Sequence, residues 1–394
     1  MRIAHVAYSF LEEDTRGLRY ITALTERGNE VDAFCLRRPG QPFRGRLAGA
    51  TIYRIQKREL NETSPASYFV RLVKFLILSA SWLSFRHFLS PYQLVHVHNV
   101  PDFLVFASLL PKLTGAKVIL DIHDILPELY AHKFKASNGS FIFKALLQVE
   151  KLSARFADHV IVANHLWLDK LTQRAVKPEK CSAIINYPDT SIFKPARARS
   201  KPGSDERFLL LYPGTLNRHQ GLDVAVKAMS LLRERIPEAQ LHIYGEGPQL
   251  GYLKKLVQDL GLEGKVFLHA PVSLSEIAGI IQEADAGVIP KLADGFGNEA
   301  FSTKSMEFMA CGVPVIMSRT LIDTTYFTDD YVWFFNPGDP ASLAETIYKV
   351  YSSPEKVRRK VKASLELVSR NNWEVKKHEY LSLVDRLVLG QCSD

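Results

Sequence analysis

One predicted helix gathers a hydroxyl, a cation and a carboxylate on a single face. These are Thr303, Lys304 and Glu307, which stand at i, i+3/i+4 spacing. We expect the helix over residues 303–311, where its free N–H groups and positive dipole end would form an anion site. Such a face suits a phosphorylated polyol such as a nucleotide ribose, and an ordinary capped, solvated helix is the alternative. The residues that bound it are the N-cap candidate Ser302, the terminating Gly312 and, just beyond, Pro314.

Glu299 and Glu307 are separated by seven residues in this segment. The segment resembles the E-x7-E region of retaining GT-B glycosyltransferases, most closely glycosyltransferase family four, and the resemblance extends over nearly the whole chain. The other matching segments, in order, are Asp14-Thr15-Arg16 with Arg19, Gly28-Asn29-Glu30-Val31, Asn186-Tyr187-Pro188-Asp189 with Phe193, Gly214-Thr215-Leu216 before Gly221-Leu222-Asp223, and Tyr244-Gly245-Glu246-Gly247-Pro248.

The resemblance implies an α/β chain with the GT-B fold, in which two Rossmann-like doubly wound domains face each other across a cleft. A nucleotide diphosphate sugar, UDP- or GDP-linked, would bind the C-terminal domain, and the acceptor would bind the N-terminal domain. The implied reaction transfers a hexosyl or N-acetylhexosaminyl group, with retention, to a glycan or polyprenyl-linked acceptor. Related chains build bacterial cell-surface polysaccharide or lipopolysaccharide. The resemblance implies neither a cofactor nor a metal.

The resemblance also implies a role for each matching residue. Glu307 would hold the ribose hydroxyls, Glu299 would meet hydroxyls of the donor sugar, and the backbone after Phe301 would receive the diphosphate. Together with the helix face described above, this makes His98, Glu299 and Lys304 the candidate catalytic residues. The candidate donor-binding residues are Gly214, Thr215, Arg218, Gly245, Gly247, Phe301, Ser302, Thr303 and Glu307, and Arg16, Arg19 and His123 are expected in the acceptor site or cleft.

Two cations of the family pattern are missing. Thr215 and Gln220 stand where the family usually carries an arginine and a lysine that clamp the diphosphate. Since stabilisation of developing charge is usually the largest catalytic effect, another cation must compensate. Arg218 and Lys304 are the candidates, and Lys304 is favoured because its helix already points at the anion. The loss leaves a non-catalytic sugar-nucleotide-binding protein as one alternative, and a nucleotide-sugar epimerase of similar fold is another.

Several histidines lie in predicted strands or just after them. His96 and His98 stand at i, i+2 and face the same side of one strand, so with His123 or Asp124 they could be drawn as metal ligands. Because the sequence has no dense carboxylate cluster, we expect no metal, and we expect His96 to be buried packing. Asp121 or Asp124 as a covalent nucleophile has no partner at a recognisable spacing.

Composition and motifs exclude other classes. The net charge of +8 favours an anionic partner, but without a basic tail we expect no nucleic acid. The sequence has no G-x-x-x-x-G-K-[ST], G-x-G-x-x-G or G-x-S-x-G motif. Four widely spaced cysteines and an N-terminus that soon becomes acidic indicate a reduced, cytoplasmic protein.

Short β-branched runs alternate with helical periodicity, as in βα units around parallel sheets. A polar, Pro- and Gly-rich linker near 193–204 divides an acceptor domain, 1–190, from a nucleotide-sugar domain, 205–370. A last helix, 373–389 within 371–394, is expected to return to the first domain. The predicted strands are near 2–8, 31–36, 51–55, 94–98, 117–122, 159–163, 182–185, 208–212, 240–244, 265–269, 286–289, 313–317 and 331–334, and helices are predicted at 16–27, 144–156, 222–235, 249–260 and 274–283.

The stretch 68–88 is apolar but is interrupted by Arg71, Lys74 and Arg86, so its uninterrupted core is too short to span a bilayer. We expect it to attach the N-terminal domain peripherally to an anionic membrane, at the inner face of the plasma membrane. A second basic and apolar patch is predicted at 141–144 with Lys133 and Lys135. The alternative is a helix that covers the sheet.

Overall fold

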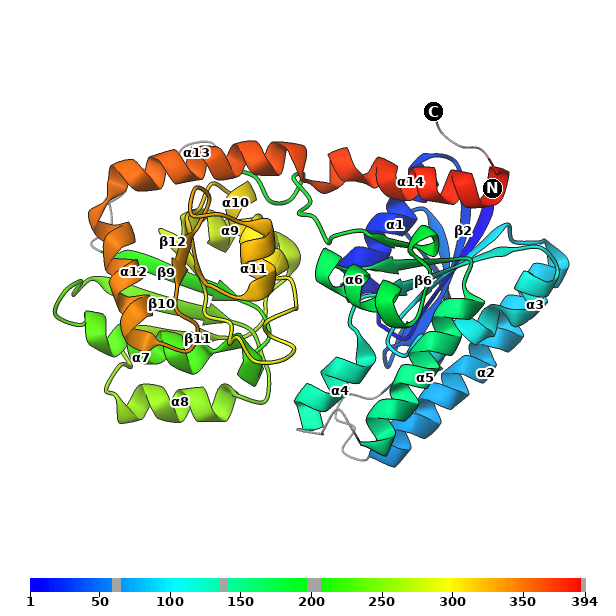
Figure 1. Cartoon of the computed structure of the whole chain (residues 1–394), viewed down its shortest axis with the longest axis horizontal. Helices are drawn as coiled ribbons and strands as arrows, with labels where there is room; N and C mark the ends of the chain where they lie inside the picture. The colour runs from blue at the N-terminus through cyan, green and yellow to red at the C-terminus, as the bar shows by residue number, and fades with distance from the viewer. Residues whose placement is uncertain (59–64, 135–139, 197–206, 391–394) are drawn as a thin grey trace. The chain divides into compact units, whose positions relative to one another are not determined.

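The chain forms two compact α/β units. The computed structural model describes residues 1–58, 65–134, 140–196 and 207–390 (Figure 1). The first unit comprises Met1–Asn186 with Lys377–Asp394, and the second comprises Tyr187–Lys376. Most of the predicted linker, 197–204, lies outside the described residues, as do Lys135 and the side chain of Lys133.

The first unit is built on an eight-stranded sheet. Every strand pair is parallel except the β3–β4 hairpin. The sequence did not predict β3, because its Arg-Gly-Arg-Leu run has no apolar alternation; in the structure both arginines are exposed and Gly45 and Leu47 are partly buried. In spatial order the strands are β3 (Arg44–Leu47), β4 (Ala50–Lys57), β2 (Glu30–Arg37), β1 (Arg2–Ala7), β5 (Leu94–His98), β6 (Lys117–Ile122), β7 (His159–Val162) and β8 (Cys181–Ala183).

The helices of the first unit begin where local capping chemistry dictates. The Asp14 carboxylate accepts the Gly17 N–H at 2.9 Å, and Ser140 and Asn164 cap two further helices in the same way. The described helices are α1 (Thr15–Glu26), α2 (Pro65–Leu89), α3 (Leu109–Leu113), α4 (Leu126–Phe134), α5 (Phe141–Phe156) and α6 (His165–Arg174), with 3₁₀ turns η1 (Leu11–Glu13), η2 (Asp102–Ser108) and η3 (Pro178–Lys180).

The last helix, α14 (Trp373–Leu389), joins the first unit from residue 377 onward. The Arg27 guanidinium pairs with Asp385 at 2.9 Å on its exposed side. On its inner side Tyr380 is fully buried, and its hydroxyl lies 2.9 Å from His96 Nδ1. The C-terminal helix therefore completes the core of a domain whose other elements come from the N-terminal half.

The second unit has a six-stranded, fully parallel sheet. Apart from β3, the strands of both units lie within two residues of their predicted bounds, and the predicted α/β architecture is confirmed. In spatial order they are β11 (Val266–His269), β10 (Ala239–Tyr244), β9 (Phe208–Pro213), β12 (Ala286–Ile289), β13 (Val315–Ser318) and β14 (Trp333–Phe335). The helices are α7 (Leu222–Leu232), α8 (Leu250–Asp259), α9 (Leu274–Glu283), α10 (Thr303–Ala310), α11 (Leu321–Tyr326), α12 (Pro340–Ser352) and α13 (Pro354–Arg370), with the turn η4 (Arg218–Gln220).

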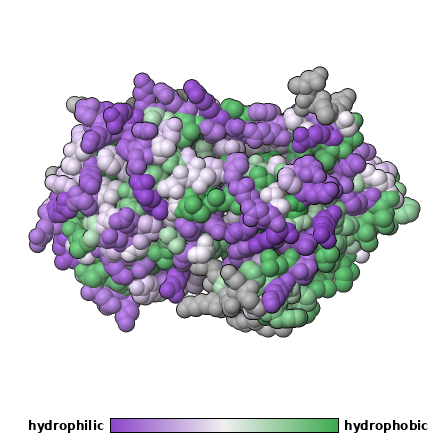
Figure 2. Space-filling model, viewed as in Figure 1, coloured by the Kyte–Doolittle hydropathy of each residue, from purple (hydrophilic) through white to green (hydrophobic). Residues whose placement is uncertain are grey.

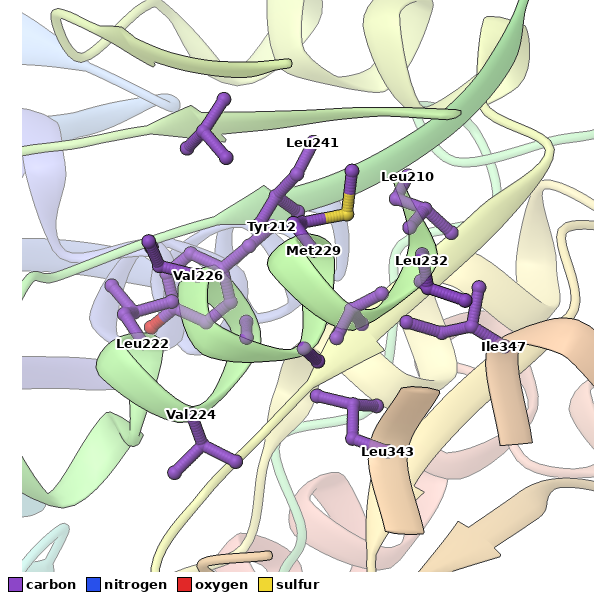
Figure 3. Packing of buried hydrophobic residues seen from close by; sticks show 14 of the residues in the cluster. Leu210, Tyr212, Leu222, Val224, Val226, Met229, Leu232, Leu241, Leu343 and Ile347 are labelled. Carbon is purple, nitrogen blue, oxygen red and sulfur yellow. The ribbon is translucent and has the colours of Figure 1, made fainter. Parts of the chain in front are cut away.

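The core of the second unit lies around α7. Figure 3 shows Val226, Met229 and Leu232 of this helix among Tyr212 of β9 and Ile347 of α12, all at most 3% exposed. Apolar residues along α7 therefore fill the layer between the sheet and α12. This packing holds the first βα turn of the unit, 214–221, at the carboxyl edge of the sheet, where open α/β sheets bind ligands.

Candidate functional site

Two glycine turns, 214–221 and 244–248, are hydrogen-bonded to each other at the carboxyl edge of the second sheet. The Gly214 N–H donates to the Tyr244 carbonyl, and the Leu216 N–H donates to the Glu246 carbonyl, both at 2.8 Å. A Cβ on Gly245 would overlap the Gly214 carbonyl, and one on Gly247 would lie 2.7 Å from the Leu216 oxygen. Both glycines also have positive φ, 150° and 156°. The contact between the two loops therefore requires these glycines, whatever binds beside them.

Helix α10 opens onto the same edge with an uncapped N-terminus. Ser302 occupies the predicted N-cap position, but its hydroxyl forms no capping hydrogen bond. The prediction that this side chain caps the helix was therefore wrong. Its carbonyl instead accepts from the N–H of Ser305 at 3.2 Å and from the hydroxyl of that residue at 2.6 Å. The predicted stop at Gly312 is confirmed: its φ is 71°, and Val313 N–H bonds the Phe308 carbonyl in a Schellman motif. The amides at the start of α10 are left without a side-chain cap.

Lys304 lies against the first glycine turn. A Cβ on Gly214 would collide with Lys304 Cε, and the ammonium lies 5.4 Å from the centre of the Tyr212 ring. Burial lowers the pKa of Lys304 to about 8, with Glu307 opposing that shift and Lys291 adding to it. Lys304 is therefore still a cation at neutral pH, beside Gly214 and at the start of α10.

Lys291 is a residue of this edge that sequence reasoning missed. It is 2% exposed, and its ammonium donates to the Ala300 carbonyl at 2.7 Å and pairs with Asp323 of α11 at 2.9 Å. Burial lowers the pKa of Lys291, and Asp323 opposes the shift. The pair holds the loop that carries Glu299 against α11. The sequence did carry a signal, because Lys291 is the second residue after β12, at the carboxyl edge of a parallel sheet.

The other predicted donor-site residues differ in how far they are exposed. Thr215 and Arg218 are exposed, whereas Glu299, Thr303 and Glu307 are partly buried. The Phe301 ring turns toward α11, 4.9 Å from the ring of Tyr326. Gln220, at a position that lacks the family lysine, lies with its Nε2 3.0 Å from His219 Nε2. The loop thus offers one exposed cation, Arg218, and α10 offers one partly buried cation, Lys304.

A second cluster of functional side chains lies inside the first unit, where β1 and β5 run side by side. His98 Nε2 lies 3.0 Å from His5 Nδ1, and its Nδ1 lies 3.2 Å from His123 Nε2. The His96 and His98 rings stack at 4.4 Å, which confirms that they share one face of the strand. His96 is fully buried, as predicted. Burial lowers the pKa of His5 and of His96 well below the usual value, and His98 adds to both shifts.

Asp121 and Arg16 anchor this histidine cluster. The Arg16 guanidinium donates to both Asp121 oxygens at 2.9 and 2.8 Å and to the Ile184 carbonyl at 2.8 Å. Burial alone would raise the pKa of Asp121, but Arg16 and then His123 outweigh it and hold that pKa well below the usual value. Arg16 was expected in the acceptor site or cleft; in the structure the residue is 7% exposed, and its guanidinium donates to Asp121 and to the Ile184 carbonyl. The buried Asp121, held in this way, does not present a nucleophile.

A pocket of about 370 Å³ lies beside the cluster, within the first unit. His98 and His123 both line it, as predicted for residues of one site. His123 also lies 2.9 Å from Asp121, so the buried carboxylate orients its ring. Arg19 is not a lining residue and donates to Asn186 at 2.6 Å. The lining consists of Ala7, Tyr8, Ser9, Phe10, Glu13, Asp14, Arg58, His98, Asn99 and His123.

Two residues of this unit were not singled out from the sequence. His5 lies directly opposite His96 in the parallel β1–β5 register, so strand alternation in both strands could have paired them. Tyr380 comes from α14, far along the chain, and no local pattern connects it with His96. Both side chains are buried; His5 contacts His98 directly, and Tyr380 contacts its neighbour on the strand, His96.

The chain resembles known proteins along most of its length. The family model described as "Glycosyl transferases group 1" matches residues 195–366, and the model described as "Glycosyl transferase 4-like domain" matches residues 15–186. The D-inositol 3-phosphate glycosyltransferase of Arthrobacter sp. (strain FB24) is 36% identical over 139 residues, which are 33% of this chain and 32% of that relative. The chain thus spans about a third of the length of this curated relative.

Solved structures share the fold. Sucrose-phosphate synthase from Thermosynechococcus elongatus superimposes with a TM-score of 0.79 at 22% identity, over 99% of this chain and 100% of that chain. Anabaena HepE, in complex with UDP and glucose, superimposes with a TM-score of 0.73 at 16% identity, over 97% and 99% of the two chains. The two parallel-sheet domains have the GT-B fold, and the chain belongs to the group 1 glycosyl transferase family.

Proposed function

We propose that the protein is a retaining glycosyltransferase that takes a hexosyl or N-acetylhexosaminyl group from a UDP- or GDP-linked donor. The observation that carries this proposal is the packing of Lys304 on Gly214 at the uncapped start of α10. Backbone amides at a helix start and a neighbouring ammonium form a site for a diphosphate. The same groups would stabilise the charge that develops on the diphosphate as it leaves.

The pocket of the first unit supports a hydroxylic acceptor. Glu13, Asp14 and Asn99 supply oxygen acceptors along its lining, which also includes His98 and His123. We propose a glycan or polyprenyl-linked acceptor and a role in bacterial cell-surface polysaccharide or lipopolysaccharide synthesis, which follows the family resemblance. Three buried free thiols, Cys35, Cys181 and Cys311, support a cytoplasmic location.

A sugar-nucleotide-binding protein without turnover is the second candidate. It is favoured by one observation, that Thr215 and Gln220 supply no charge at the first glycine turn. Donor binding tests both candidates, whereas transfer of labelled sugar to a lipid or glycan acceptor separates them. Binding without any transfer across an acceptor panel would favour the non-catalytic candidate.

Glu307→Gln tests the donor site directly. If Glu307 accepts the ribose hydroxyls, its loss should weaken binding of UDP or GDP about tenfold to a hundredfold, because hydrogen bonds to a charged group contribute about 1.5–3 kcal/mol. Titration calorimetry with each nucleotide measures the effect. Glu366→Gln, an exposed change on α13, is the matched control and should bind normally. Unchanged affinity in Glu307→Gln would contradict the ribose assignment.

We expect sugar transfer to persist after exhaustive chelation. Among the described residues, two groups of side chains have metal-ligand spacing: His5, His96 and His98, and His98, Asp121 and His123. However, both ring nitrogens of His98 have histidine neighbours within 3.2 Å, and Asp121 already faces the Arg16 cation. A transfer assay after EDTA treatment and desalting makes the test. Full loss of activity that a single divalent ion restores would show that one of these groups holds a metal.

A further inference from the structure

A continuous apolar surface covers one side of the first unit. Along α2 the outward positions 69, 70, 77, 85, 88 and 89 are all large apolar residues, and Phe88 is 81% exposed. The neighbouring α3 exposes Leu113 at 78%, and the start of α5 exposes Phe141 at 85%. Both α2 and α5 contact η2, and Figure 2 shows the hydrophobic side chains gathered over this side of the unit. Scattered apolar residues are normal on a surface, but a patch carried by three adjacent helices marks an interaction site.

The inner side of α2 packs against the sheet of the first unit. Leu72, Phe75 and Leu83 are at most 5% exposed. The Arg71 carbonyl accepts from Gln56 of β4 at 3.1 Å, and Arg86 approaches Asp32 of β2 at 3.4 Å. α2 is the one helix of the described residues with the length and apolar composition of a membrane span, but only 22% of that stretch is buried. The helix therefore covers the sheet with one side and leaves the other side without cover inside the unit.

The exposed charged residues of α2, α3 and α5 are all basic. Across α2, α3 and α5 the only acidic residue is Glu150, which is 1% exposed and pairs with Arg174 at 2.6 Å. Lys74 lies on the outward stripe of α2, and Lys144 and Arg155 are exposed on α5. A symmetric contact with a second copy would bring these cations together, which disfavours that occupant. An anionic lipid surface complements both features, since it accepts apolar side chains at the acyl boundary and attracts lysine and arginine.

We infer that α2, α3 and the start of α5 form a docking face for an anionic phospholipid bilayer, on which α2 lies flat and which it does not cross. The apolar stripe enters the headgroup and acyl boundary, and the flanking cations contact lipid phosphates. This inference does not depend on sugar transfer, because it concerns a surface separate from the glycine turns and from the pocket. If the proposed acceptor is lipid-linked, the same face brings the acceptor pocket to the membrane.

Vesicle flotation tests the docking face with the full chain. At low salt the protein should float with phosphatidylcholine vesicles that contain phosphatidylglycerol and should stay behind with phosphatidylcholine alone. Lys74→Glu/Lys144→Glu should weaken partitioning at least about tenfold, since each basic residue near an anionic surface contributes about a factor of five. Ile77→Ser/Phe85→Ser/Phe141→Ser should weaken it at least as much, because the apolar contacts are lost. All five positions are exposed, so circular dichroism should show unchanged folding.

The matched controls lie in the second unit. Lys254→Glu/Lys255→Glu on α8 and Leu231→Ser on α7 alter exposed residues of the same types and should float like the wild type. Failure of the wild type to float with anionic vesicles at low salt would overturn the inference. So would a dimer in ultracentrifugation that the α2 substitutions dissociate without any vesicle binding, because a second copy would then cover this face. UDP and GDP binding, measured on each variant, reports on the proposed function separately from flotation.

Discussion

Replacing Lys304 with methionine is expected to lower kcat/KM for sugar transfer about a hundredfold to a thousandfold, the usual effect of losing one preorganised group that stabilises transition-state charge. Arg218→Ala should cost less than about tenfold. Lys304 is partly buried against Gly214 at the start of α10, where its charge is poorly screened, whereas Arg218 is exposed in the loop. Methionine keeps the apolar stem over Tyr212 and removes only the charge.

The pH dependence sharpens this test. The pKa of Lys304 is about 8, so the ammonium is present below that pH and is lost as the pH rises through and above it. Wild-type affinity for UDP or GDP should therefore fall on the alkaline side, and the Lys304→Met variant should lack that decline. Lys255→Met, an exposed change on α8, should behave as the wild type does. A silent Lys304→Met beside a strongly impaired Arg218→Ala would show that the loop supplies the compensating cation.

Asp121→Asn is expected to lower the free energy of unfolding of the first unit by about 3–5 kcal/mol. Asp121 is fully buried, and it neutralises an Arg16 side chain that is itself 8% exposed. Removing one partner of a buried pair leaves the other charge uncompensated in a low-dielectric interior. Denaturant unfolding followed by hydrogen exchange in β5 and β6 measures the change in this unit.

Two comparisons make the Asp121 result interpretable. Asp385→Asn removes a half-exposed partner of Arg27 and should cost less than about 1 kcal/mol. The double variant Arg16→Met/Asp121→Leu removes both charges and should recover most of the stability lost in Asp121→Asn. If Asp121→Asn were as mild as the surface variant, or the double variant recovered nothing, the buried pair would not be what anchors the histidine cluster.

Most of the secondary structure could be predicted from single segments, because periodicity and capping act within a few residues. The alternation of β-branched runs and helical periodicity predicted both parallel sheets, because each buried strand and each amphipathic helix carries its own pattern. The end of α10 at Gly312 followed from the backbone conformation that glycine permits. The strand β3 was missed because its Arg-Gly-Arg-Leu run has no alternation of apolar residues.

Site residues were predictable where a motif or a strand end marked them. Lys304 came from the face of one helix, His98 came from the family pattern, and His123 came from its place at the end of the next strand. The structure then placed both histidines in one pocket. Lys291 could have been found by the rule that ligand-site residues follow parallel strands. Arg16 matched the family pattern, but nothing in the sequence indicated that its guanidinium would pair with the Asp121 carboxylate.

The sequence by itself determined the elements, their order and the α10 segment, because capping, periodicity and turn geometry act within a few residues. Only the tertiary structure decided which buried charges and rings meet. Arg16 meets Asp121 across 105 positions, and His96 meets Tyr380 across 284. It also decided that α2 covers the sheet and still exposes an apolar stripe. Such pairings depend on how distant segments pack, and a buried charge takes whichever partner the fold places beside it.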